Sequence, residues 1–112
     1  MAAQTVTLWC TLRPAAGRES ELRQVLLDLA TKVHSVEQTC VRYEVFEMDS
    51  STAGPSSTMF HLLEQWPSQI DLDRHTQREW LVDIRKKFDA GLLAEAELIE
   101  NMSKIGGFTS PS

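Results

Sequence analysis

Long apolar runs are absent from this chain of 112 residues, and cysteine is scarce. Only Cys10 and Cys40 occur, each inside an apolar stretch and not in a C-x-x-C pair, so the sequence predicts no disulfide framework. No run approaches the roughly 20 apolar residues that a membrane span needs. The start, MAAQTVTLWC, lacks the basic region and apolar core of a signal peptide. We therefore expect a cytoplasmic protein with reduced thiols and no membrane contact.

Basic residues are outnumbered by acidic ones. The 11 Lys and Arg residues face 16 Asp and Glu residues, which gives a net charge of −5. Proteins that bind nucleic acid concentrate Lys and Arg on one face. The one basic run here, Arg85-Lys86-Lys87, falls late in a predicted helix, where cations suit the helix dipole. The sequence therefore predicts no nucleic-acid partner.

Clustered metal ligands are missing from the sequence pattern. The histidines stand at His34, His61 and His75, without the i,i+4 spacing of a helical ligand pair, and no Cys/His cluster accompanies them. We expect no bound metal.

The composition that remains is that of a soluble globular domain. Hydrophobic residues make up 42% and charged residues 24%, close to the averages for such domains. A chain of this length builds one small core, to which a partner subunit would add. We expect a single domain over residues 1–105 and a flexible tail over residues 106–112.

Hydrophobic periodicity predicts the order of the elements. Apolar and polar residues alternate in the predicted strands, as in Val6-Thr7-Leu8-Trp9, and recur at spacings of three and four in the predicted helices. In chain order we predict a strand over 5–13, a helix over 18–36, a strand over 40–48, a surface loop over 49–57, a strand over 58–66, helices from 69 to about 91, and a strand over 97–105.

The region after residue 66 carries specific boundary signals. Ser68 is a good N-cap, with Asp71 three residues on. The apolar positions that follow step by four, so one straight helix would rotate them off the core. We therefore predict two helical pieces with a bend over 75–77, the second closed by Gly91.

This order predicts an α+β fold of the ferredoxin-like βαββαβ type, with four antiparallel strands and helices on one face only. The uncovered face would carry several large apolar side chains, and such a patch is typical of a subunit interface. We expect a two-fold homodimer that stacks these faces. The residues predicted on this face are Thr7, Trp9, Phe46, Met59, His61 and Leu63.

Three short stretches resemble the antibiotic biosynthesis monooxygenase family. They are Arg13-Pro-Ala-Ala-Gly-Arg-Glu19, Glu37-Gln-Thr-Cys-Val-Arg-Tyr43, and Glu64-Gln-Trp66 followed by His75. The middle stretch departs from the family's Glu-Pro-Gly-Cys-x-x-Tyr, because Gln38 and Thr39 replace Pro and Gly. The resemblance covers residues 5–105 and implies the dimeric α+β barrel fold.

The resemblance also implies a chemistry. Some members of this family are oxygenases that use no metal, flavin or haem and act with O₂ on phenolic or quinol-type polyketides. Such chemistry needs a base, donors for the resulting oxyanion, and a dry cavity. The haem-degrading relatives carry an Asn late in the first strand, where this sequence has Cys10. We therefore expect no cofactor, and a small aromatic substrate together with O₂.

Candidate site residues follow from the same resemblance. His75 is a suitable base, and Glu64 would orient it or itself accept a proton. The remaining candidates would contact the substrate by stacking, by hydrogen bonding or by lining the cavity: Trp66, Tyr43, Phe60 and Leu72.

Structural roles compete with these assignments. His75 could cap backbone groups at the bend, and Trp66 and Tyr43 could be packing residues. Glu64 could be satisfied by a salt bridge to Arg74 or Arg78. Two other functions stay open: an isomerase of a small carbonyl compound that uses the same base, and a non-catalytic dimer that binds a ligand or supports a partner enzyme. An acidic interface would then include Glu95, Glu97 and Glu100.

Overall fold

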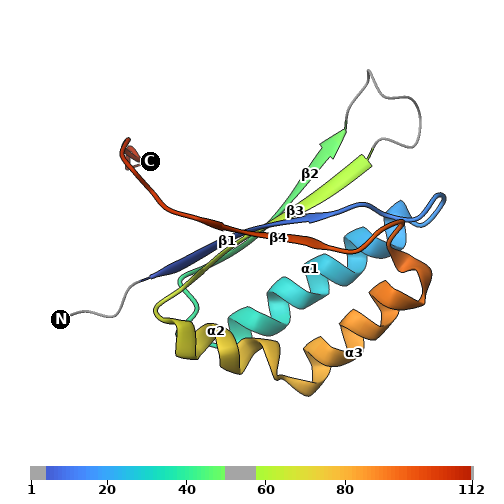
Figure 1. Ribbon diagram of the computed structural model, residues 1–112, viewed down its shortest axis with the longest axis horizontal. Coiled ribbons are helices and arrows are strands. Elements are labelled where there is room, and N and C mark those ends of the chain that lie inside the picture. The colour runs from blue at the N-terminus through green and yellow to red at the C-terminus, as the bar shows by residue number, and fades with distance from the viewer. Residues whose placement is uncertain (1–4, 50–57, 112) are drawn as a thin grey trace.

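The computed structural model describes residues 5–49 and 58–111 and consists of one antiparallel sheet with helices packed on one face (Figure 1). The strand order is β2-β3-β1-β4, and every neighbouring pair is antiparallel. The predicted α+β fold is confirmed, with two helices after β3. The elements are β1 (Val6–Leu12), α1 (Glu19–Val36), β2 (Arg42–Asp49), β3 (Thr58–Trp66), α2 (Gln69–Thr76), α3 (Glu79–Lys87), η1 (Phe88–Leu92) and β4 (Leu98–Met102).

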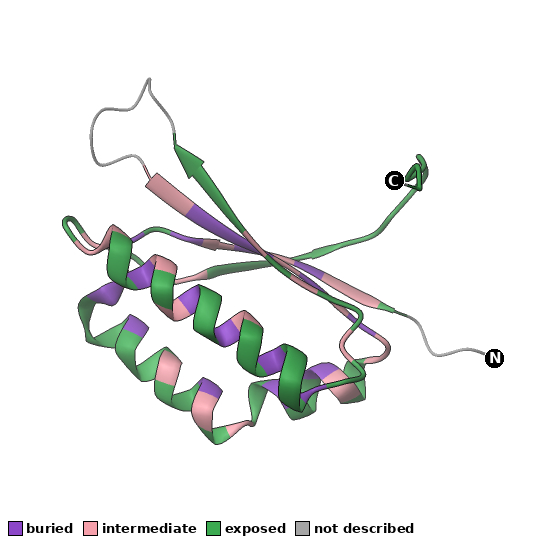
Figure 2. Ribbon diagram, turned by 180° about the vertical axis from the view of Figure 1, so that it is seen from behind, coloured by how far each residue is buried: buried purple, intermediate pink, exposed green. Residues whose placement is uncertain are grey.

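The core lies between the sheet and the helices. In β1 and β3 the even-numbered side chains face the helices, and buried positions recur along α1 (Figure 2). Because paired residues of antiparallel strands share a face, the register Cys10↔Leu62 and Leu12↔Phe60 brings both rows together. The fully buried side chains include Leu12, Leu22, Leu26, Phe60, Trp66 and Leu92.

The predicted cap and bend are both present. The Ser68 hydroxyl accepts a hydrogen bond from the Asp71 backbone N–H at 3.3 Å, so α2 begins where the sequence indicated. Arg78 has extended backbone angles of φ −62° and ψ 133°, which ends one helix and starts the next. The bend lets both helices keep an apolar side against the core.

Gly91 closes the second helical region, as predicted. Its φ of 111° lies in the left-handed region that side chains rarely adopt. The chain then runs beside the end of β1, where Ala15 donates to the Leu92 carbonyl and Ala94 to the Arg13 carbonyl, each at 2.9 Å. These bonds set where β4 enters the sheet.

Two strand boundaries differ from the prediction by more than one residue. β2 begins at Arg42 instead of residue 40, and β4 ends at Met102 instead of residue 105. Met102 pairs with Thr7, next to the first residue of β1. Residues after Met102 therefore have almost no β1 backbone with which to form hydrogen bonds. Of the predicted loop over 49–57 only Asp49 is among the described residues, and it is the last residue of β2 and not part of a loop. No helix among the described residues is long and apolar enough to cross a membrane.

Candidate functional site

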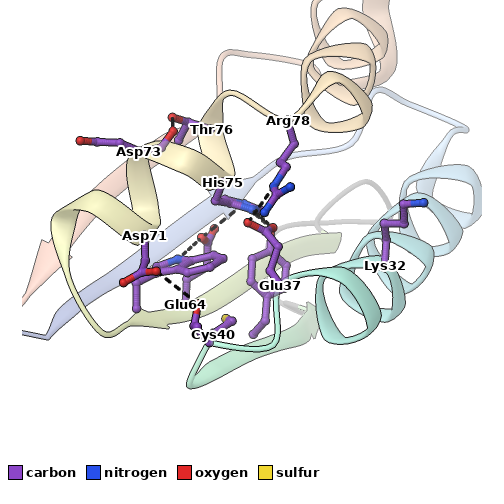
Figure 3. A network of polar contacts seen from close by, with 12 residues as sticks. Lys32, Glu37, Cys40, Glu64, Asp71, Asp73, His75, Thr76 and Arg78 are labelled. Atoms are coloured by element: carbon purple, nitrogen blue, oxygen red, sulfur yellow. Dashed lines mark hydrogen bonds and ion pairs between the residues drawn. The ribbon is translucent and has the colours of Figure 1, made fainter.

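His75 lies in the last turn of α2 and points toward the sheet (Figure 3). Its side chain is buried, with 2% of the residue exposed. The ring Nδ1 lies 2.6 Å from Oε2 of Glu37, a short, charge-assisted distance. The imidazole therefore bonds to a carboxylate and does not cap the backbone at the bend, so that structural alternative is wrong.

Glu37 is the residue that the sequence interpretation missed. It caps the C-terminus of α1, where its backbone N–H donates to the Val33 carbonyl at 2.8 Å, and only 5% of it is exposed. Its second oxygen, Oε1, accepts from Arg78 Nε at 3.3 Å. Glu37 opens one of the family-like stretches, so the signal was present. Its contact with α2 depends on the tertiary fold.

The other ring nitrogen of His75 faces the sheet. Nε2 lies 3.4 Å from the Tyr43 hydroxyl and 3.8 Å from Oε1 of Glu64. The Trp66 ring packs beside the imidazole with 4.6 Å between centroids. The structure thus brings together four of the predicted site residues, from α2, β2 and β3.

Glu64 is buried, and none of the arginines in the described part of the chain pairs with it. Oε1 accepts from the Trp66 indole N–H at 3.0 Å, and Oε2 accepts from the Cys10 thiol at 3.4 Å. The predicted alternative of a bridge to Arg74 or Arg78 is wrong, because Arg78 pairs with Glu37 and Arg74 lies 4.0 Å from Asp71. The indole is therefore a donor to the network as well as a packing surface.

Burial controls the protonation of the neutral donors. It raises the pKa of Tyr43 well above its usual value, and the nearby Glu64 carboxylate raises it further. Burial and Glu64 also raise the pKa of Cys10. Both groups therefore keep their protons. Because His75 donates its Nδ1–H to Glu37, its Nε2 carries the lone pair and accepts a hydrogen bond from the Tyr43 hydroxyl.

Phe60 and Leu72 lie in the hydrophobic core near this network. Phe60 is fully buried, with the Arg23 guanidinium carbon 5.6 Å from its ring centroid. Leu72 is 8% exposed and belongs to the same core cluster. Their contact with a substrate stays a prediction.

Open space adjoins the buried network on two sides. Glu37, Cys40 and Tyr43 line a groove of about 130 Å³ at the end of α1. A larger cavity of about 440 Å³ lies at the β4 edge and includes Glu97 in its wall. Across residues 5–49 and 58–111, no group of three or more His, Cys, Asp or Glu side chains is arranged to hold a metal ion.

The family model for antibiotic biosynthesis monooxygenases matches residues 5–87. The chain belongs to the antibiotic biosynthesis monooxygenase family. The match spans β1 through α3 and so contains His75, Glu37, Tyr43, Glu64 and Trp66. A comparison with curated proteins finds no match.

Solved structures share the fold of this family member at low sequence identity. PA3566 from Pseudomonas aeruginosa is 22% identical with a TM-score of 0.76, covering 95% of this chain and 99% of that chain. Rv0793 from Mycobacterium tuberculosis is 22% identical with a TM-score of 0.73, covering 95% and 100%. A Caulobacter crescentus protein, provisionally named an antibiotic biosynthesis monooxygenase, is 23% identical with a TM-score of 0.75, covering 93% and 92%. At these identities the likeness shows the fold.

Proposed function

We propose that this family member is a monooxygenase that uses no metal, flavin or haem and acts on a phenolic or quinol-type aromatic substrate. The observation that carries the proposal is the orientation of His75. A carboxylate holds Nδ1 at 2.6 Å, and Nε2 faces Tyr43 and Glu64 in the interior. A base whose tautomer and direction are set by a carboxylate is the arrangement that general-base catalysis uses.

The rest of the network supports the charge changes of such a reaction. When His75 takes a proton, the Glu37 carboxylate stabilises the imidazolium, because a short contact in a dry site is strongly attractive. The Tyr43 hydroxyl and the Trp66 indole N–H contact His75 and Glu64 and so stabilise the charge that moves through these two residues. Glu64 accepts from the indole at 3.0 Å and holds it in place.

The chemistry balances without a reducing cofactor. An anthrone-type CH₂ group loses a proton to the base, and the resulting carbanion transfers electrons to O₂. One oxygen atom becomes the new carbonyl and the other leaves as water, so the substrate supplies all four electrons. The protein's tasks are to remove the proton, to hold the oxyanion and to exclude water.

Oxygen consumption tests this proposal. We expect O₂ uptake with anthrone or hydroxyquinol and no added cofactor, measured with an oxygen electrode after metal chelation. His75→Gln should lower the rate about 100-fold or more, while the matched variant His34→Gln, on the exposed face of α1, should keep it. Circular dichroism of both variants controls for folding.

Other outcomes separate the competing functions. Deuterium exchange into a carbonyl substrate without O₂ uptake would indicate an isomerase. Equal behaviour of His75→Gln and the unmodified chain in both assays would contradict any catalytic role of this histidine.

We also propose that two copies pair through the open face of the sheet. Paired residues share a face, so Phe46 and Met48 on β2 and Leu98 and Met102 on β4 lie on the side away from the helices. Each of the four is at least 40% exposed. An apolar surface of this kind is costly in water and is typical of a subunit interface.

A further inference from the structure

A cavity of about 440 Å³ lies at the β4 edge of the sheet. Ile99 pairs with Cys10 and so shares the helix-facing side, yet it is 44% exposed. The space above it, about 440 Å³, is the cavity. Its lining combines apolar and charged side chains from α3, η1 and the approach to β4: Arg85, Phe88, Asp89, Leu93, Glu95, Ala96, Glu97 and Ile99.

Glu97 connects this cavity to the buried network. It is half-buried in the cavity wall, and its carboxylate lies near enough to the Cys10 thiol to raise the pKa of that thiol. The same thiol lies 3.4 Å from Glu64, whose other oxygen is 3.8 Å from His75 Nε2. A continuous line of polar groups therefore leads from open space to the histidine.

Electrostatics make Glu97 a suitable proton carrier. Burial raises its pKa, and the Arg85 guanidinium opposes this only in part. A carboxyl group whose pKa moves toward neutrality exchanges protons more readily near pH 7. Glu95, by contrast, is exposed and bound to Arg13 at 3.0 Å.

We propose that the cavity at the β4 edge binds the hydroxylated aromatic substrate and that Glu97 is the catalytic residue that first accepts its proton. The inference rests on the proposed function, because it assigns the substrate position of the same site. The ring would pack on Phe88 and Ile99, and Arg85 would pair with the phenolate that remains after proton loss.

The proton step is a relay that balances. The substrate O–H bond breaks and its proton passes to the Glu97 carboxylate. Glu97 protonates the Cys10 sulfur in the same step in which the Cys10 S–H proton moves to Oε2 of Glu64, so no thiolate forms. The protonated Glu64 carboxyl then rotates and releases that same proton to His75 Nε2. The net change is one proton moved from substrate to imidazole, with the three intermediate groups restored.

Binding is tested apart from turnover by an NMR titration under argon with hydroxyquinol as the probe. We expect the signals of Leu93 and Ile99 to shift, and those of residues 38–41 in the groove at the end of α1 to stay in place. Ala96→Trp fills the cavity without altering the buried network and should weaken binding at least tenfold. Shifts centred on residues 38–41, or no shifts at all, would overturn the inference.

The relay is tested with substitutions at the two members that the substrate proton reaches first. Glu97→Gln should leave hydroxyquinol binding within about threefold and lower O₂ uptake about 100-fold, while Glu79→Gln, an exposed carboxylate at the start of α3, should match the unmodified chain. Cys10→Ala should lower uptake at least tenfold, and Cys10→Ser, which keeps a proton donor, should recover most of it. Equal rates for Cys10→Ala and Cys10→Ser would overturn the relay.

The two proposals fail in distinguishable ways. Shifts at Leu93 and Ile99 without O₂ uptake would contradict the oxygenase function and leave the binding cavity in place. Uptake that persists in Ala96→Trp would overturn the cavity and leave the oxygenase function in place.

Discussion

Glu37 lies between a histidine and an arginine, and its two oxygens bond to both. A buried carboxylate is costly unless it is paired, and these contacts satisfy it. At the scale of single residues the site is therefore a chain of mutually satisfied polar groups. His61, on the opposite face of the sheet, is different: its Nε2 is buried with no partner among the described residues.

Glu37→Gln should separate the orienting role of this residue from its charge. The amide oxygen can still accept from His75 Nδ1, but it no longer stabilises the imidazolium. We expect O₂ uptake to fall about 10- to 100-fold and the free energy of unfolding to fall by about 1–3 kcal/mol.

The pH profile of uptake should also shift in Glu37→Gln, which a purely structural role would not cause. Glu47→Gln, which removes the exposed partner of Arg23, is the matched control and should change neither quantity. An unaltered rate and pH profile in Glu37→Gln would contradict the orienting role.

The two thiols should be unreactive in the folded protein. Burial raises the pKa of Cys40 from 9.0 to about 11, which lowers its thiolate fraction at pH 8 about 100-fold. The pKa of Cys10 is raised further by burial and by Glu64. Ellman's reagent should therefore react slowly with the native chain and rapidly with both thiols in urea. One fast equivalent in the native protein would contradict this prediction.

At the scale of elements, the short helix α2 carries the central residue of the site. It spans Gln69–Thr76 and depends on Ser68 at its N-terminus, because isolated helices of this length are marginal in water. The extended backbone at Arg78 ends the region, and the same residue bonds to Glu37. Both ends of α2 thus help to orient His75.

Ser68→Ala should test this dependence. Loss of the cap to the Asp71 backbone N–H should lower the free energy of unfolding by about 1 kcal/mol, measured by urea titration. Amide exchange should quicken in α2 more than in α1. Ser35→Ala, at an exposed α1 hydroxyl bonded to the Lys32 carbonyl, should be close to neutral, and an equal loss in both variants would contradict the capping role.

At the scale of the whole molecule, the sheet has a covered and an uncovered side. The helices cover the even-numbered residues of β1 and β3, most of which are buried, whereas β4 is exposed along its length (Figure 2). Trp9 stacks on His61 with ring centroids 4.6 Å apart and lies 6.0 Å from Phe46. These aromatic rings form a surface suited to a second copy of the chain.

Phe46→Glu should break the proposed dimer. Light scattering with size-exclusion chromatography should give twice the chain mass of 12.7 kDa for the unmodified protein and the single-chain mass for the variant, because a buried unpaired carboxylate opposes association. Val82→Glu, at a similarly exposed position on α3, should remain dimeric. An unmodified chain that runs as a monomer would overturn the proposal.

Local signals in the sequence were enough for the elements and their faces. Alternation over 58–66 predicted the bounds of β3 and its helix-facing side, and Ser68 predicted the start of α2. These features depend on neighbouring residues, whose period and capping chemistry can be read directly. The predicted start of β2 and the predicted end of β4 were less accurate, because a strand boundary also depends on how far the partner strand extends.

The sequence by itself determined the fold class, the order of elements and the bend in the second helical region. Its family resemblance pointed to His75, Tyr43, Glu64 and Trp66, but that these four side chains meet was decided by the fold. Only the tertiary structure decided how their charges are satisfied. Glu37 meets His75 across 38 positions, and Glu97, just before β4, comes near Cys10 in β1. Such contacts arise from the register of the sheet and the packing of α1 against α2, and no local pattern encodes them.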